Sequence, residues 1–146
     1  MITLSNILSN FTTSRLCPEI IVHGLSVSST TVNPGDVFLA TKGLRVDGFD
    51  YIDEAKSRGA TAIIADWDGD LETTQKFYEC QGKLGIPIIG VIGLTQNISC
   101  LASRFYSEPS KKINVMAVTG TNGKTTCAQL YTLSLIHISE PTRPLT

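Results

Sequence analysis

Short apolar runs separated by polar segments recur along most of the chain. Runs rich in Val, Ile and Ala occupy residues 20–23, 37–40, 61–65, 86–92 and 113–118. Their short length and the glycines and prolines around them are typical of buried strands. We therefore expect a strand in each run, with Pro87 at the start of the fourth or on a sheet edge.

Helical periodicity separates these runs. It is clearest over residues 95–105, where Thr95 can cap the first turn and apolar side chains recur three and four positions apart: Ile98, Leu101, Ala102 and Phe105. Residues 51–58 predict another helix, and Gly59 follows it where a left-handed C-terminal cap is expected. Weaker helical patterns cover two further segments, 3–11 and 71–80.

Strands that alternate with helices predict an α/β fold built on a largely parallel or mixed sheet. The polar segment 107–112 has the composition of a linker. We therefore expect a small α/β domain over residues 1–109, and the first strand, loop and helix of a second domain over 110–133. In the remaining segment, 134–146, Ile136 and Ile138 alternate as in a strand, and its prolines disfavour a helix.

Composition and charge narrow the class of protein. The chain has 146 residues, of which 42% are hydrophobic and 17% charged, as in a folded globular protein. A formal net charge of −1 offers no broad basic surface, so we expect no nucleic-acid partner. Four scattered cysteines suit a reducing compartment. Since no segment has the pattern of a signal peptide or a membrane span, we expect a cytoplasmic protein.

The string VMAVTGTNGKTT places a glycine-rich loop directly after an apolar run. Gly120 and Gly123 let backbone amides converge on an anion, and a helix that starts here turns its positive end toward the same point. Lys124 can then reach the terminal phosphates of a nucleotide, and the hydroxyl of Thr125 can hold Mg²⁺. The general spacing requires glycine where this chain has Val118, so only the second half of the motif is matched. The alternative is a glycine turn that holds a lysine by chance.

The string VTGTNGKTT resembles the ATP loop of the Mur ligase family, in which this form replaces the general one. Three upstream segments are also similar to that family: NPGDVFLATKG, DGFDYIDEAKSRGATAII and RFYSEPS. The last is similar to the member that adds the third amino acid of the peptidoglycan stem peptide. The resemblance covers about residues 1–132.

This resemblance implies an ATP-dependent ligase. It joins a diamino acid, meso-diaminopimelate or L-lysine, to UDP-N-acetylmuramoyl-L-alanyl-D-glutamate through an acyl phosphate, and we expect it to act as a monomer. The first domain would bind the UDP-muramoyl substrate, and the second would be P-loop ATPase-like. Lys124 would be the catalytic residue and Thr125 the Mg²⁺ ligand. The implied ATP contacts are Gly120, Thr121, Asn122, Gly123, Lys124, Thr125 and Thr126.

The resemblance also places two sets of contacts to the uridine nucleotide. Val27 and Ser29 form the first set, and the second consists of Leu44, Arg45 and Val46. The family often has Asp-Ser-Arg at the first set and His-Gln at the second, where this chain has Ser-Ser-Thr and Leu-Arg. Arg45 can offer a phosphate a fork of donors instead, or it is a solvated loop charge.

Several family elements lie downstream of the residues present. They are the carboxylate that holds Mg²⁺, a modified lysine and the motif that recognises the amino acid. We therefore expect a fragment that is inactive alone. The string SLIHISEPTRPLT, which ends the chain, is similar to a translated sequencing adapter, so we expect 134–146 to be non-native. Two alternatives are the family member that adds D-alanyl-D-alanine, and a UDP-sugar-binding module without catalysis.

Overall fold

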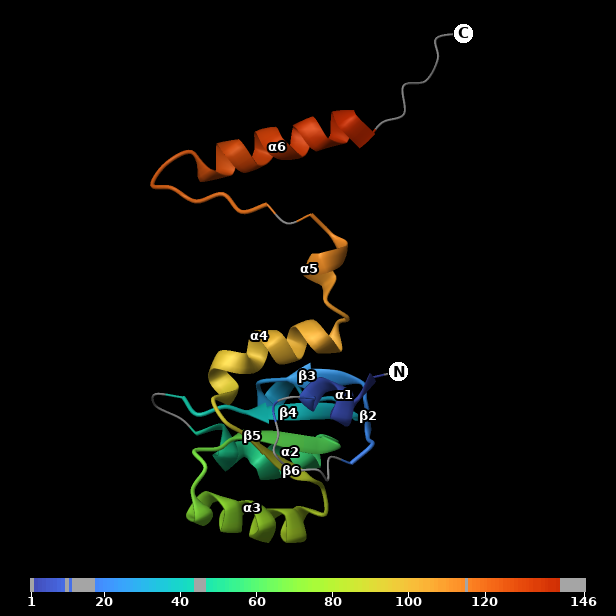
Figure 1. Ribbon diagram of the computed structural model, residues 1–146, viewed down its shortest axis with the longest axis vertical. Coiled ribbons are helices and arrows are strands. Elements are labelled where there is room, and N and C mark those ends of the chain that lie inside the picture. The colour runs from blue at the N-terminus through green and yellow to red at the C-terminus, as the bar shows by residue number, and fades with distance from the viewer. Residues whose placement is uncertain (1, 10, 12–17, 44–46, 115, 140–146) are drawn as a thin grey trace. The chain divides into compact units, whose positions relative to one another are not determined.

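Figure 1 shows the computed structural model of the chain, which describes residues 2–9, 11, 18–43, 47–114 and 116–139. The chain divides into two compact units, Met1–Pro109 and Ser110–Thr146. Both hydrophobic clusters found among the described residues lie in the first unit. The first unit therefore provides the packed framework that positions one of the two candidate sites.

A four-stranded parallel sheet forms the centre of the first unit. Its strands, in spatial order, are β3 (Gly24–Ser26), β4 (Asp36–Ala40), β5 (Ala62–Asp66) and β6 (Ile88–Val91). All of β4 and nearly all of β5 are buried, because these two strands lie inside the sheet and are covered on both faces. The predicted α/β class with a parallel sheet is confirmed.

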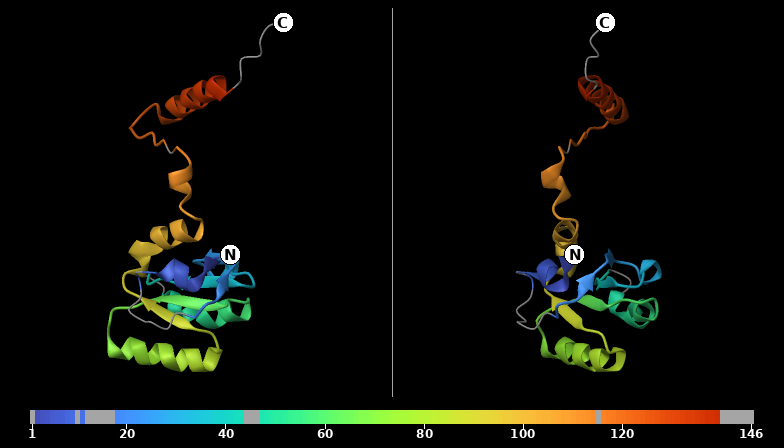
Figure 2. Two further views of the ribbon diagram at one scale, coloured as in Figure 1. Left: turned by 45° about the vertical axis from the view of Figure 1, so that its right-hand side comes forward. Right: turned by 90° about the vertical axis from the view of Figure 1, so that its right-hand side faces the viewer.

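Helices cover both faces of this sheet, as the right-hand view of Figure 2 shows. One face packs against η2 (Gly48–Tyr51), α2 (Ile52–Ser57) and α3 (Leu71–Leu84). The other packs against α1 (Leu4–Leu8) and α4 (Leu94–Phe105). Successive side chains of a strand point to opposite faces, so Phe38 enters the first cluster and its neighbour Leu39 the second.

Two short strands and β3 differ from the expected pattern. β1 (Ile2–Thr3) and β2 (Ile21–Val22) pair antiparallel in a separate two-stranded sheet, which confirms part of the strand predicted over 20–23. β3 was not predicted, because its sequence Gly-Leu-Ser lacks the β-branched residues typical of strands. It forms through parallel pairing with β4, with Gly24 opposite Asp36.

The helix over the second face begins differently from the prediction. The N-cap of α4 is Gly93, with φ of +64°, and not Thr95. The carboxylate of Asp66, at the end of β5, accepts the Leu94 N–H at 3.1 Å and the Thr95 hydroxyl at 3.3 Å. A carboxylate from another element therefore satisfies the helix terminus, which leaves Thr95 inside the first turn.

The two α-helices on the first face, α2 and α3, are each terminated by a glycine with positive φ. Gly59 has φ of +103° and ends the helical segment of α2, which confirms the predicted cap. Gly85 has φ of +68° and ends α3, which runs beyond the predicted range 71–80. A side chain at Gly59 would also collide with the backbone of Pro34, 2.9 Å from the position of its Cβ.

The described residues of the second unit form α5 (Pro109–Lys112), which starts at the boundary, and α6 (Lys124–Ser139). No strand forms among the described residues of 113–118, although one was predicted there. A strand requires a neighbour to receive its hydrogen bonds, and no described segment pairs with these residues. The strand-like alternation of Ile136 and Ile138 does not give a strand, because α6 continues through Ser139. That residues 134–146 are non-native stays a prediction, and residues 140–146 lie outside the described part.

Candidate functional site

The glycine-rich loop of the second unit leads directly into α6. Gly120 has φ of +148° and Gly123 has φ of +75°, conformations that other residues rarely adopt. The carbonyl of Gly123 accepts the N–H of Cys127 at 2.9 Å. The loop therefore ends in the first turn of a long helix, where backbone N–H groups and the helix dipole favour an anion.

Lys124 is the first residue of α6, and its side chain folds back over the loop. Its Nζ donates hydrogen bonds to the carbonyl oxygens of Gly120 and Thr121. The positive charge is thus held beside the helix N-terminus. The predicted ATP contacts form one continuous exposed segment: Gly120, Thr121, Asn122, Gly123, Lys124, Thr125 and Thr126.

Thr125 is the predicted Mg²⁺ ligand and lies exposed in the first turn of α6. A hydroxyl oxygen is a hard donor of the kind Mg²⁺ prefers, so the residue type and its place beside Lys124 fit the ion. Within the described ranges, no three His, Cys, Asp or Glu side chains gather into a metal site. None of the helices in this part of the chain is long and apolar enough to span a bilayer.

The first set of predicted uridine contacts lies just beyond β3, at the carboxyl edge of the sheet. Val27 is 59% exposed, whereas Ser29 is only 6% exposed. The Ser29 hydroxyl donates a 2.7 Å hydrogen bond to Oε2 of Glu54, on α2. The structure therefore leaves the Val27 side chain accessible and commits the Ser29 side chain to an internal contact.

The second set, Leu44, Arg45 and Val46, lies outside the described residues. The loop that carries these residues is closed at its base by a bridge between Lys42 and Asp47. Lys42 also forms a 2.8 Å ion pair with Asp68. The hydrogen bond that Lys42 donates to Asp68, and the attraction between the two charges, raise the pKa of Lys42, so its ammonium stays charged at neutral pH. Lys42 follows the end of β4, and Val27 follows the end of β3. Because these strands are parallel, both residues lie at the same edge of the sheet.

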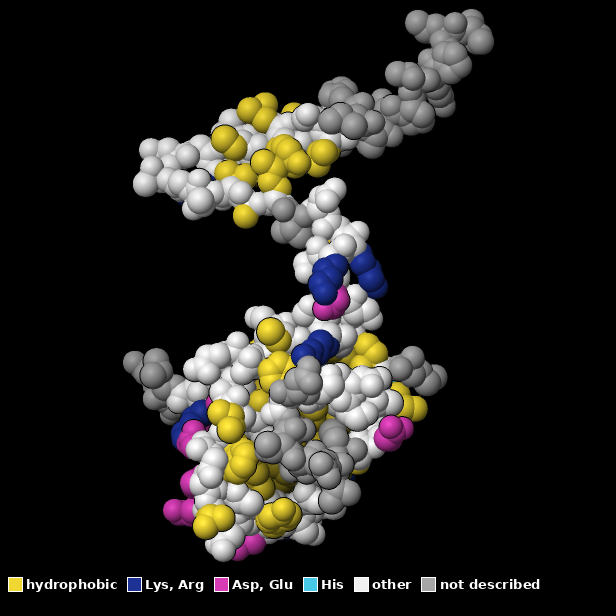
Figure 3. Space-filling model, viewed as in Figure 1, with side chains coloured by type: hydrophobic (Ala, Val, Ile, Leu, Met, Phe, Trp, Pro, Cys, Tyr) yellow, Lys and Arg dark blue, Asp and Glu magenta, His cyan; other side chains and the backbone are white. Residues whose placement is uncertain are grey.

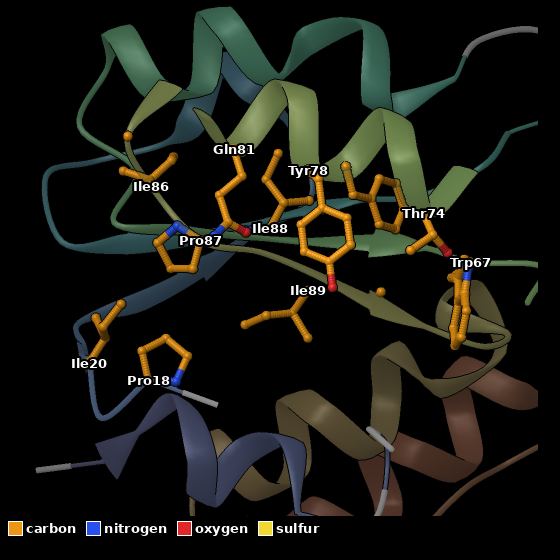
Figure 4. A pocket seen from close by; sticks show the side chains of 13 residues that line it. Pro18, Ile20, Trp67, Thr74, Tyr78, Gln81, Ile86, Pro87, Ile88 and Ile89 are labelled. Carbon is orange, nitrogen blue, oxygen red and sulfur yellow. The ribbon is translucent and has the colours of Figure 1, made fainter. Parts of the chain in front are cut away.

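A pocket that sequence reasoning missed runs along β6 (Figure 4). It has a volume of about 840 Å³ and is lined mainly by apolar and aromatic side chains. Tyr78 and Gln81 extend into it from α3. Oε1 of Gln81 accepts the backbone N–H of Ile88 at 3.3 Å. Its residues come from α3, β6 and the segment before β2, so no local sequence motif marks it.

The amino-acid sequence matches the family model described as "Mur ligase family, catalytic domain" over residues 21–106, more than half of the chain. The chain belongs to the Mur ligase family. The match to the Mur ligase model lies within the first unit and ends before the glycine-rich loop. The match to the family model is therefore carried by residues of the α/β domain.

Individual Mur ligases agree with this assignment. A protein of Pseudomonas putida KT2440 named UDP-N-acetylmuramoyl-L-alanyl-D-glutamate–2,6-diaminopimelate ligase is 40% identical over 79% of this chain and 22% of its own length. A Coxiella burnetii RSA 493 protein of the same name is 38% identical over 82% and 23%. A solved MurF ligase of Thermotoga maritima in complex with ADP is 32% identical over 75% and 22%, with a TM-score of 0.47, too low to support an argument. The chain spans less than a quarter of the length of the curated relatives it matches.

Proposed function

We propose that this chain is part of an ATP-dependent ligase that adds diaminopimelate to UDP-N-acetylmuramoyl-L-alanyl-D-glutamate during peptidoglycan synthesis. The observation that carries the proposal is the identity of 36–40% to relatives named for that reaction. Their names favour diaminopimelate over L-lysine as the amino acid. They also favour this reaction over the addition of D-alanyl-D-alanine and over binding without catalysis.

The glycine-rich loop supports the ATP part of this proposal. The amides of Gly120–Gly123 and of the first turn of α6 would bind phosphate oxygens. Lys124 would exchange its bonds to the loop carbonyls for bonds to the transferring phosphate, whose developing charge it neutralises. Thr125 would hold Mg²⁺, which supplies further neutralisation of the phosphate charge when bound.

The first unit would hold the uridine end of the substrate. Val27, Ser29 and the loop of Leu44–Val46 follow neighbouring parallel strands, and ligands of open α/β sheets bind beyond the carboxyl ends of the strands. Transfer of phosphate to the substrate carboxylate creates a leaving group that the amine of the amino acid displaces. We propose further that the protein acts as a monomer in the cytoplasm, without nucleic acid or membrane partners.

Measurement of ADP release by the full-length protein encoded by the gene tests this function. We expect release only when the muramoyl dipeptide, diaminopimelate and Mg²⁺ are all present, and no turnover by the 146-residue chain. Replacing diaminopimelate by L-lysine tests whether L-lysine is the amino acid added. Replacing the muramoyl dipeptide by the muramoyl tripeptide, and diaminopimelate by D-alanyl-D-alanine, tests the ligase that adds D-alanyl-D-alanine. Faster release with either replacement would overturn the proposal.

A further inference from the structure

We propose that Glu54 and Arg58 form a clamp, here the α2 clamp, that fixes Ser29 and Thr30 so that this segment binds a uridine nucleotide through its main chain. The inference rests on the proposed function, which assigns Val27 and Ser29 to the uridine end of the substrate. It adds two positioning residues on another element and gives the Ser29 side chain the role of an anchor.

The Ser29 hydroxyl has one hydrogen to donate, and Glu54 receives it at 2.7 Å. Ser29 is 6% exposed, so its side chain is turned into the protein. A hydrogen bond to an ionised carboxylate is stronger than one between neutral groups. The hydroxyl therefore cannot donate to a nucleotide while this bond is present, which leaves the main chain of the segment to supply the donors.

Arg58, the C-cap residue of α2, completes the clamp. Its Nε donates to Oε1 of Glu54 at 3.2 Å, and its Nη1 donates to the carbonyl oxygen of Thr30 at 3.1 Å. Both carboxylate oxygens of Glu54 are thus bonded, one to the segment itself and one to Arg58. The side chains of Arg58 and Glu54 are 44% and 38% exposed, so the α2 clamp joins two elements at the surface.

The turn itself orients the main chain. The carbonyl of Ser28 accepts hydrogen bonds from the hydroxyl of Ser26 at 2.8 Å, and from the hydroxyl and N–H of Thr31, both at 3.1 Å. In a planar trans peptide the next N–H points opposite to the carbonyl. The N–H of Ser29 is therefore directed away from this group of hydroxyls, in a segment whose residues on either side, Val27 and Thr30, are exposed.

Calorimetry with the 146-residue chain and UDP-N-acetylmuramic acid tests the α2 clamp. We expect Glu54→Ala and Ser29→Ala each to weaken affinity about 10-fold, the scale of one hydrogen bond to a charged group. The double variant should bind no more weakly than either single variant, because both remove the same bond. Glu54→Gln keeps an acceptor for Ser29 and should recover part of the affinity.

Asp53→Ala is the matched control, because Asp53 lies on the same helix and faces Lys83 at 3.6 Å. It should bind as the unchanged chain does. Hydrogen exchange adds a local readout: the N–H groups of Thr31 and Val32 should exchange faster in Glu54→Ala, while those of β4 should not. A change at β4 as well would mean general unfolding and would overturn the positioning role.

Further outcomes separate this inference from the proposed function. If the unchanged chain binds and Glu54→Ala binds equally well, the α2 clamp is overturned and the uridine site stands. If Ser29→Ala alone weakens binding, the hydroxyl contacts the ligand directly and the inference is again wrong. If the unchanged chain releases no heat at millimolar ligand, the uridine site fails and the inference fails with it.

Discussion

Lys124 already makes two bonds to its own loop, to the carbonyls of Gly120 and Thr121. Its charge is thus held at the start of α6. Loss of the Lys124 side chain should therefore weaken stabilisation of the transition state and leave the fold intact. We expect Lys124→Ala in the full-length protein to lower kcat for ADP release by about 100-fold or more. Lys112→Ala, an exposed lysine at the end of α5, is the control and should retain activity. Equal rates for both variants would contradict a catalytic role.

Asp70 is the N-cap of α3, and its carboxylate accepts the N–H of Thr73 at 3.1 Å. Hydrogen bonding to Thr73 lowers the pKa of Asp70 below its ordinary value of 3.8. Since the folded-state pKa is the lower one, the ionised carboxylate stabilises the fold above the unfolded value, and this contribution is lost as the pH falls through the folded value.

We therefore expect Asp70→Ala to lower the Tm at neutral pH, with a smaller difference from the unchanged chain once the pH is well below 3.8. Thermal unfolding followed by circular dichroism measures both. Glu79→Ala removes an exposed carboxylate later in the same helix and controls for net charge. A difference that stayed constant on acidification would exclude the charge as its cause.

At the scale of elements, Asp66 links the end of β5 to the start of α4. Because its carboxylate accepts the N–H of Leu94 and the hydroxyl of Thr95, Asp66→Ala should cost about 1–2 kcal/mol of unfolding free energy. Asp66→Asn keeps an acceptor and should cost less. Urea titration gives these values, and Asp68→Ala, at an exposed ion pair, should change stability little. Equal losses at both positions would contradict the cap.

The elements that sequence predicted well are those whose pattern matches their burial. Residues 37–40 and 62–65 are apolar throughout, as expected of β4 and β5, which are covered on both faces. β3 escaped prediction because its pairing with β4, rather than its side chains, makes it a strand. The reverse holds at 113–118, where strong β propensity forms no strand without a paired neighbour among the described residues.

In the candidate site, too, residues of a local motif could be predicted from the sequence, whereas contacts between distant residues could not. Sequence alone predicts a phosphate site at Gly120–Thr126 because its glycines, lysine and threonines lie in one short segment; that role stays a prediction. The contact between Ser29 and Glu54 was not, because the two residues are 25 positions apart and neither belongs to a recognised spacing. Bonds of this kind depend on how α2 packs against the sheet, which no local pattern encodes.

At the scale of the whole chain, the two units differ in packing. Between residues 110 and 135 the structure describes no buried side chain, and Figure 3 shows hydrophobic side chains over the surface of α6. The exposed large hydrophobic residues include Leu130, Tyr131, Leu133 and Leu135. Both hydrophobic clusters belong to residues 1–109. The first unit should therefore fold without the second.

We expect residues 1–109, expressed alone, to unfold cooperatively with a Tm within about 4 °C of the whole chain, the change produced by roughly 1 kcal/mol. Differential scanning calorimetry measures this. A shorter version that ends at Gly85 lacks β6 and α4 and should show no cooperative transition. Loss of cooperativity in 1–109 would mean that the second unit contributes to the core.

The bond from Ile88 to Gln81 has a consequence for solubility. Among the described residues, β6 has a strand neighbour on one side alone, so its far side is where a foreign strand would add. Because the Gln81 amide oxygen occupies the Ile88 N–H, an incoming peptide must first displace it. One uncharged side chain thus occupies a backbone donor that an added strand at this border of the sheet would need.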